Sequence, residues 1–307
     1  MLRRYVTADV FTEQAFGGNP LAVVLDAEGL TTEQMQSIAT EFNYSETTFV
    51  LPARKAAHTA HVRIFTPTKE VPFAGHPNVG TAVVLAQARD SAGEAPADKF
   101  VFEELAGLVP IRLIRQAGQV AGAELTAPQP LSIGASLSTE DAAASLSLSA
   151  TDICTLTHPP QVLSVGLPFL VVELVSREAL RRCKAVISVH ARVLPPIGTD
   201  SVFAYARGSF SGQLHARMFA PLDACTEDPA TGSASGATIA RLAALQGGSD
   251  QEQSWRIEQG FDMGRPSVIL GRTTKRGNVV SAVYIAGHVV TVMRGTIEIT
   301  PPGDSYT

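Results

Sequence analysis

The sequence predicts an α/β protein built from two similar lobes. Its 307 residues suggest two domains of about 150 residues each. Segments rich in β-branched and aromatic residues alternate with segments of helical periodicity. A short segment also recurs: His61 to Pro67 and His215 to Pro221 share four of seven residues, 154 positions apart. Chance is the alternative for so short a match, but a small-residue segment that opens a helix follows both copies.

The first half is expected to hold six strands and two helices. The first helix begins at Thr31, which can cap it, and Met35, Ile38 and Phe42 recur at helical spacing. The second helix follows Pro77 and is apolar throughout, which is typical of a buried helix. The expected strands cover residues 6–11, 21–25, 43–51 and 61–65, with two more within 100–114, and the helices cover 31–41 and 79–88.

The second half repeats this order after a connection. Residues 132–150 are rich in Ser and Ala and predict a connection with a short exposed helix. A boundary is expected near 115–130, with lobes at 1–122 and 123–290 and with a strand at 291–307 able to return to the first lobe. The expected strands lie within 161–175, 201–205, 214–219, 268–270, 279–285 and 289–299, and the helix covers 231–245.

Composition and charge exclude several classes of protein. The net charge is −5 and the pI about 5.8, and no basic stripe with interleaved aromatics suggests nucleic-acid binding. The three cysteines, Cys154, Cys183 and Cys225, are too widely spaced for a disulfide framework or a zinc site. No apolar signal-peptide stretch opens the chain, and no apolar run is long enough to span a bilayer. We therefore expect a cytoplasmic protein that binds neither membrane nor nucleic acid.

Familiar cofactor and nucleophile motifs are missing from the sequence. It contains no dinucleotide-binding glycine fingerprint and no P-loop. The segment from Gly232 to Gly236 has alanine at its centre, so it is not a nucleophile elbow. The His residues form no metal-binding motif, and we expect no metal. The acid–base candidates are then Glu46, His76 and Asp228, each near a glycine-rich turn.

Each candidate has a structural alternative. Glu46 lies in a segment that predicts a strand, so its carboxylate is either on the wet face or deliberately buried. His76 and Asp228 either cap a helix or take part in chemistry. Both expected helix starts are rich in small residues, which suits an anion that approaches the backbone N–H groups. Capping by Thr231 or Ser233 is the alternative for the second start.

Taken together, the motifs resemble the PhzF-like family of phenazine biosynthesis, within the wider diaminopimelate-epimerase fold. They occur in order over nearly the whole chain, which makes the combination specific. The matching segments are Asp9–Phe11, Gly18–Pro20, Ala22–Val23, Ser45–Val50, Phe65–Pro67, Gly75–Pro77, Gly80–Ala82 and Glu227–Ser233. The resemblance implies two pseudo-symmetric lobes, each a mostly antiparallel sheet wrapped round a central helix, with the active site between them, and a homodimer.

The same resemblance implies roles for single residues. Glu46 matches the general acid/base, and His76 and Asp228 match its polar partners around the substrate. The residues that match substrate-binding positions are Asn19, Ser45, Gly75, Pro77, Thr231, Gly232 and Ser233. Racemases of the wider fold use two cysteines, but the aligned positions here hold Ala74 and Pro229.

We therefore expect a cofactor-independent isomerase that moves a proton within a small cyclic carboxylic acid, with Glu46 largely buried. The alternatives are an epimerase of a small acid, or a binding or scaffold protein that keeps the fold without catalysis.

Overall fold

Two compact units make up the part of the chain that the computed structural model describes, residues 1–223 and 225–299. The first unit comprises Met1–Phe16, Pro20–Leu125 and the chain from His288 onward. The second comprises Gly17–Asn19 and Thr126–Gly287. The segment Gly17–Asn19 thus belongs to the second unit, although it lies between two strands that pair within the first.

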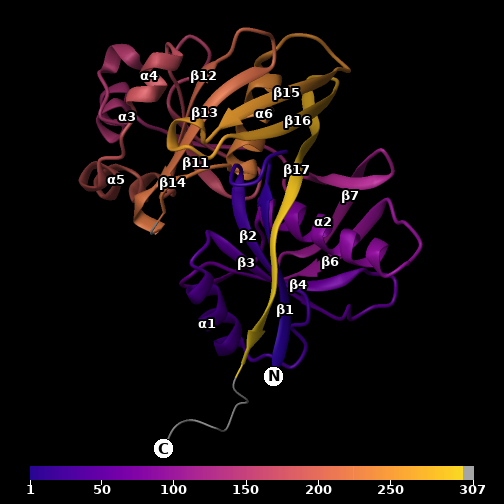
Figure 1. Cartoon of the computed structure of the whole chain (residues 1–307). Helices are drawn as coiled ribbons and strands as arrows, with labels where there is room; N and C mark the ends of the chain where they lie inside the picture. Colours follow the sequence, from indigo (N-terminus) through magenta and orange to yellow (C-terminus); the bar gives the residue numbers. More distant parts are fainter. Residues whose placement is uncertain (224, 300–307) are drawn as a thin grey trace, which may run out of the picture. The chain divides into compact units, whose positions relative to one another are not determined.

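The elements of the first unit follow the chain from the N-terminus (Figure 1). Its strands are β1 (Leu2–Val10), β2 (Asn19–Val24), β3 (Glu46–Leu51), β4 (Ala60–Phe65), β5 (Glu70–Val71), β6 (Lys99–Glu104), β7 (Gly107–Gln116) and β8 (Gln119–Thr126). Its helices are α1 (Thr32–Phe42) and α2 (Gly75–Ser91). The capping box that Thr31 forms with Gln34 fixes the start of α1.

The second unit holds the remaining elements. Its strands are β9 (Ser132–Ser136), β10 (Gln161–Ser164), β11 (Pro168–Glu173), β12 (Val202–Arg207), β13 (Gln213–Ala220), β14 (Cys225–Asp228), β15 (Glu252–Gln259), β16 (Ser267–Arg276) and the first half of β17 (Val279–Glu298). Its helices are α3 (Thr139–Ser145), α4 (Arg177–Arg182), α5 (Ile187–Val193) and α6 (Gly232–Leu245).

Both units join their strands in the same order. In the first, β2 is parallel to β3, β3 antiparallel to β4, β4 parallel to β6, and β6 antiparallel to β7. In the second, β11, β12, β13, β15 and β16 repeat these four pairings in turn. The repeated sequence segments occupy equivalent strands, since His61 is on β4 opposite Glu103 and His215 is on β13 opposite Glu258. The repeat in the sequence therefore has a counterpart in strand topology.

Each unit encloses one helix that is buried on nearly all sides. Every residue of α2 from 76 to 84 is buried, and so is every residue of α6 from 234 to 240. Gly80 lets α2 come close to its sheet, because a Cβ there would lie 2.5 Å from the Leu21 side chain and 2.7 Å from that of Val10. A helix without a polar face is stable only inside such a shell. The predicted mixed fold, with a sheet around a central helix in each lobe, is confirmed.

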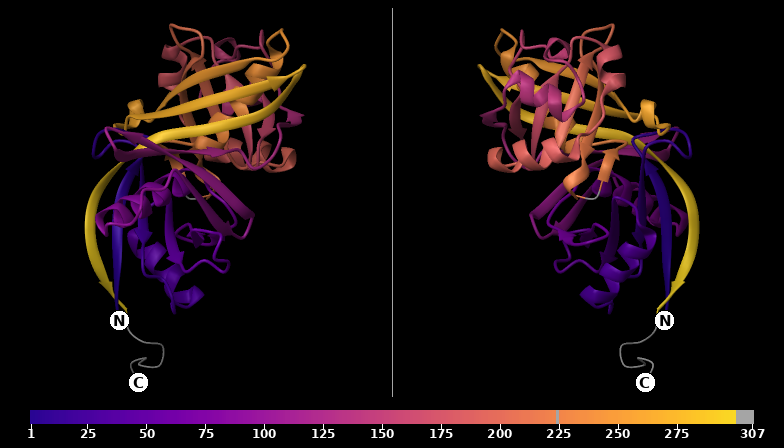
Figure 2. Two further views of the ribbon diagram at one scale, coloured as in Figure 1. Left: turned by 90° about the vertical axis from the view of Figure 1, so that its right-hand side faces the viewer. Right: turned by 90° about the vertical axis from the view of Figure 1, so that its left-hand side faces the viewer.

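One long strand, β17, changes partner along its length. Its first part pairs with β16, from Val279 opposite Arg276 to Ala286 opposite Leu270. From Val289 onward it runs antiparallel to β1, as both views of Figure 2 show. The sequence predicted two strands here, and the structure joins them into one. Of the strand expected at 291–307, residues 300–307 lie outside the described part of the chain.

Three other expectations differ from the structure. Helix α2 begins at Gly75, before Pro77, because a proline in the first turn removes an N–H that has no helical partner. Strand β8 occupies part of the expected boundary region. The helix within 132–150, expected to be exposed, buries Ala142 and Ala143 in the core, because their small side chains allow close approach. The sequence also gave no warning of β9, β15, α4 and α5.

Candidate active site

Glu46 and His76 lie next to each other in the first unit. Glu46 is the first residue of β3, and His76 is the second residue of α2. Oε2 of Glu46 is 3.4 Å from Nε2 of His76, and the two side chains are only 19% and 7% exposed. The carboxyl group is therefore sheltered, as we expected, and the wet-face alternative is wrong.

The imidazole of His76 is neutral at working pH. Burial lowers its pKa to about 3, because a charged ring loses its hydration inside the protein. The contact with Glu46 is thus a polar contact to a neutral ring and not an ion pair. A neutral imidazole can donate a proton to one neighbour or accept one from it, according to its tautomer.

Asp228 is held at both carboxylate oxygens in the second unit. Asn19 Nδ2 donates to Oδ1 over 2.8 Å, and the Thr231 hydroxyl donates to Oδ2. Asn19 also donates to the carbonyl oxygen of Ala230 over 3.0 Å. Burial raises the pKa of Asp228 to about 6, and these two hydrogen bonds oppose that rise. The three residues that the sequence proposed from separate motifs are thus joined in one cluster.

Gln259 completes this cluster and was missed from the sequence. Its Oε1 accepts from the Thr231 backbone N–H over 3.0 Å, while its Nε2 donates to the Asp228 carbonyl over 2.8 Å and to the Thr231 hydroxyl over 3.0 Å. It is 1% exposed at the end of β15. Trp255 and Ile257 are buried with it at a spacing of two, and this alternation was the signal that could have found the strand.

The other predicted residues lie on the same elements. Ser45 directly precedes β3. Gly75 and Pro77 are the first and third residues of α2. Gly232 and Ser233 are the first and second residues of α6.

Neither helix start is closed by the side chain of its own cap residue. Ala74 at the start of α2 makes no side-chain cap bond, and neither does Thr231 at the start of α6. The Thr231 hydroxyl is directed at Asp228 instead, so the capping explanation for Thr231 is wrong. Unpaired first-turn N–H groups and the positive end of the helix dipole suit both starts to an anion.

Asp228→Asn is expected to change how stability depends on pH. The folded-state pKa of about 6 lies above the ordinary value of 3.8, so the folded protein binds this proton more tightly than the unfolded chain. The penalty for an ionised buried Asp228, on the order of 3 kcal/mol, is full above about pH 6 and relieved towards pH 4. Wild-type Tm should therefore gain on the Tm of the variant as pH falls from about 7 to 4.

His76 titrates in the opposite sense but is present in both proteins, so its contribution cancels from this comparison. Differential scanning calorimetry at several pH values makes the measurement. A Tm difference that does not vary with pH would contradict the burial of an ionisable Asp228.

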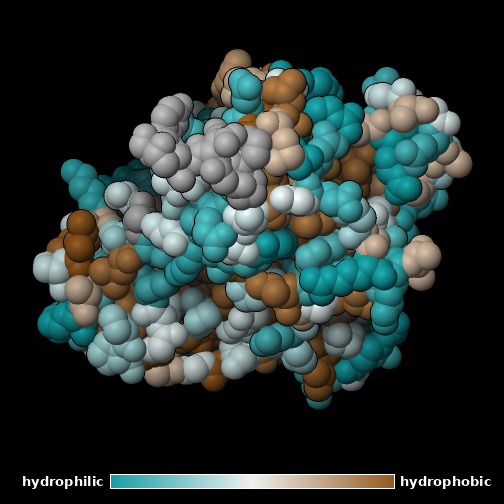
Figure 3. All heavy atoms as spheres, turned by 90° about the horizontal axis from the view of Figure 1, so that it is seen from below, coloured by the Kyte–Doolittle hydropathy of each residue, from teal (hydrophilic) through white to brown (hydrophobic). Residues whose placement is uncertain are grey.

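No group of three or more His, Cys, Asp or Glu residues that could hold a metal ion occurs within residues 1–223 and 225–299. Over the same residues, no helix has the length and hydropathy needed to cross a membrane. On the face drawn in Figure 3, hydrophobic residues occur in small groups between hydrophilic ones.

Comparisons with known proteins agree with this architecture. A family model described as phenazine biosynthesis-like protein (PhzC-PhzF) matches residues 8–295. An uncharacterized isomerase of Mesorhizobium japonicum is 38% identical, over 97% of this chain and 99% of the relative. The trans-2,3-dihydro-3-hydroxyanthranilate isomerase of Pseudomonas chlororaphis is 34% identical, over 96% of this chain and 99% of the relative.

A solved structure extends the likeness to the fold. The PhzF-family phenazine biosynthesis protein of Bacillus anthracis superimposes with a TM-score of 0.86 at 27% identity, over 97% of this chain and 100% of that one. The family match, the named isomerases and the shared fold agree with one another. The chain belongs to the phenazine biosynthesis-like (PhzC-PhzF) family and is an isomerase.

Proposed function

We propose that the chain is a cofactor-independent isomerase that moves a proton between two carbons of a small cyclic carboxylic acid. The observation that carries the proposal is the sheltered carboxyl group of Glu46, 3.4 Å from the neutral imidazole of His76. A carboxylate held in a sheltered place is a stronger base than one in water, and carbon acids need such a base. Glu46 is accordingly the proton carrier.

The reaction balances without any other reactant. The carboxylate of Glu46 takes a proton from a substrate carbon, and the electron pair left behind shifts the neighbouring double bond. Glu46 then returns the proton at the carbon where the displaced pair arrives, which restores its carboxylate. His76 orients the carboxyl group and holds its proton between the two transfers.

Binding roles fall to groups that accept or attract. The ionised carboxylate of Asp228, oriented by Asn19 and Thr231, has lone pairs left over to accept a hydrogen bond from a substrate N–H or O–H. The helix starts at Gly75 and Gly232 attract the substrate carboxylate, and their N–H groups stabilise negative charge that develops in the reaction.

The cysteines support this assignment over a two-thiol racemase. The two helix starts carry Ala74 and Pro229 at the positions where racemases of the wider fold place their thiols. Cys183 is buried behind α4, where burial raises its pKa to about 12, so it stays a neutral thiol.

The test is proton exchange in deuterated water, with trans-2,3-dihydro-3-hydroxyanthranilate as the probe because a relative is named for it. We expect one deuterium in a product whose double bond has moved, as measured by NMR and mass spectrometry. A product of unchanged connectivity with an inverted centre would instead identify an epimerase. If neither this probe nor a panel of cyclic carboxylic acids exchanges a carbon-bound proton, the proposal fails and a binding role takes its place.

A further inference from the structure

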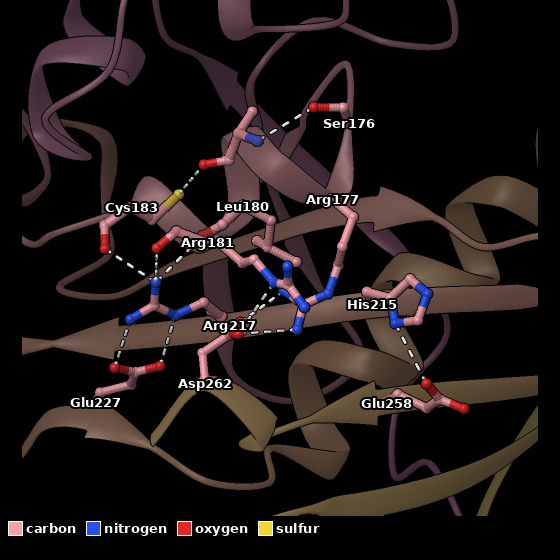
Figure 4. A network of polar contacts seen from close by, with 11 residues as sticks. Ser176, Arg177, Leu180, Arg181, Cys183, His215, Arg217, Glu227, Glu258 and Asp262 are labelled. Atoms are coloured by element: carbon pink, nitrogen blue, oxygen red, sulfur yellow. Dashed lines mark hydrogen bonds and ion pairs between the residues drawn. The ribbon is translucent and has the colours of Figure 1, made fainter. Parts of the chain in front are cut away.

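Arg217 joins two parts of the second unit through nearly all of its donors. Its Nε and Nη2 donate to the two carboxylate oxygens of Glu227 over 2.7 and 2.8 Å. Its Nη1 lies 3.1, 3.1 and 3.0 Å from the carbonyl oxygens of Leu180, Arg181 and Cys183, at the end of α4 (Figure 4). The guanidinium also covers the Phe219 ring, with 4.9 Å from Cζ to the ring centroid.

The contact with Glu227 is of a strong kind. Both side chains are largely buried, 11% and 15% exposed, and the fork geometry makes two parallel charge-assisted hydrogen bonds. Glu227 immediately precedes Asp228 on the short strand β14. The pairing of β14 with β13 is irregular, with Met218 opposite Asp228 and Ala220 opposite Cys225. Few ladder bonds hold this strand, so the side-chain fork supplies much of its anchorage.

The first unit repeats the arrangement. Arg63 on β4, which is 154 positions before Arg217, donates through Nε and Nη2 to both oxygens of Glu70, each over 2.7 Å. Its Cζ lies 5.1 Å from the centroid of the Phe65 ring. Glu70 opens the short strand β5, which leads to the start of α2. Each unit thus ties down the segment that leads to its central helix with an arginine fork.

We propose that Arg217 is a positioning residue: its fork on Glu227 fixes the strand that carries Asp228 and cancels the charge of the neighbouring carboxylate. The functional part of this inference rests on the proposed function, in which Asp228 acts as an ionised acceptor. A purely structural ion pair would hold β14 in place but would leave the ionisation of Asp228 unaffected.

The charges near the fork define what removing each partner does. The charged or titratable groups around it are Arg177 and Arg181 on α4, Cys183 after it, His215 on β13, Glu258 on β15 and Asp262 after β15 (Figure 4). The hydrogen-bond partners of Asp228 itself are neutral, and Glu227 is the charged group that raises its pKa. Removing Arg217 leaves Glu227 uncompensated, whereas removing the Glu227 charge leaves Arg217 uncompensated.

The two single variants should therefore move the ionisation of Asp228 in opposite directions. Arg217→Gln should raise its midpoint by about one pH unit, and Glu227→Gln should lower it by about one, the order that an unbalanced charge produces in a partly buried site. The double variant should return close to wild type. Carboxyl ¹³C NMR of the full chain gives the midpoint, with the Asp228 signal identified by its loss in Asp228→Asn.

Arg177→Gln is the matched control. It removes the bidentate pair of Arg177 with Asp262, over 2.6 and 3.0 Å, at the other end of α4, and should leave the midpoint of Asp228 where it is. Glu227→Gln keeps an acceptor for Arg217, so it tests the inference even if Arg217→Gln does not fold. Midpoints that stay fixed, or that move in the same direction in both single variants, would overturn the inference.

Activity then separates this inference from the proposed function. In the exchange assay, the low-pH limb of kcat/KM should follow the NMR midpoints, upward for Arg217→Gln and downward for Glu227→Gln. Opposite NMR shifts in a protein that exchanges no substrate proton would support the fork and refute the proposed function. An active enzyme whose low-pH limb ignores both substitutions would refute the link between the fork and catalysis.

Discussion

Glu46→Gln is expected to slow proton exchange by about 10²- to 10⁴-fold, the contribution of a positioned acid–base group. Glutamine has the shape of glutamate and can keep a polar contact with His76, but it cannot take a proton from carbon. The effect should fall on kcat, with binding of substrate largely preserved. Deuterium incorporation into the probe, followed by NMR, gives the rate, and isothermal titration gives the binding.

The control for this substitution is Glu41→Gln, which makes the same chemical change at an exposed position near the end of α1. It should exchange at the wild-type rate. Circular dichroism should show the same fold in all three proteins. Exchange by Glu46→Gln at the wild-type rate would remove Glu46 from the mechanism.

Gly260→Ala is expected to destabilise the protein by several kcal/mol, the range of substitutions that force backbone to move. Gly260 has φ +78°, and a Cβ there would lie 2.2 Å from the carbonyl oxygen of Arg265 and 2.7 Å from that of Pro229. Backbone atoms cannot swing away as a side-chain tip can. The turn must open, and it lies directly after Gln259, which holds Asp228 and Thr231.

Gly264→Ala separates the two causes. Gly264 has nearly the same conformation, φ +80°, but no atom lies within 4 Å of its added Cβ. It should lose only about 1–2 kcal/mol, the cost of a left-handed conformation for alanine. Urea unfolding at fixed pH measures both variants. Equal losses would mean that the turn at Gly260 relaxes without cost.

The architecture of the two units could be predicted from the sequence because it is encoded locally. Alternating apolar residues mark strands, and the repeat of His, Arg, Phe and Pro marks equivalent strands in both halves. Strand β15 alternates as well, yet its polar ends, Glu252 and Gln259, hid it among loop residues. The start of α2 was misplaced because Pro77 reads as a boundary in sequence, although the first turn tolerates it.

The candidate site was predictable in its members but not in their contacts. Glu46, His76 and Asp228 stood out as acid–base residues beside glycine-rich turns. The hydroxyl of Thr231 could equally have capped its own helix, and only Gln259, 28 positions later, determines that it faces Asp228. Such choices depend on residues that are distant in sequence, so no local pattern contains them.

The pairing of β1 with the far end of β17 bears on how the protein is made. Leu2 lies opposite Glu298 and Val10 opposite Val289, so the opening strand of the chain pairs with residues that leave the ribosome almost 300 positions later. Contacts of such long sequence separation form slowly. Until then β1 exposes an unpaired edge, a hazard for association with other chains. The first unit is begun first during synthesis and completed last, which makes it the part of the nascent chain most in need of a chaperone.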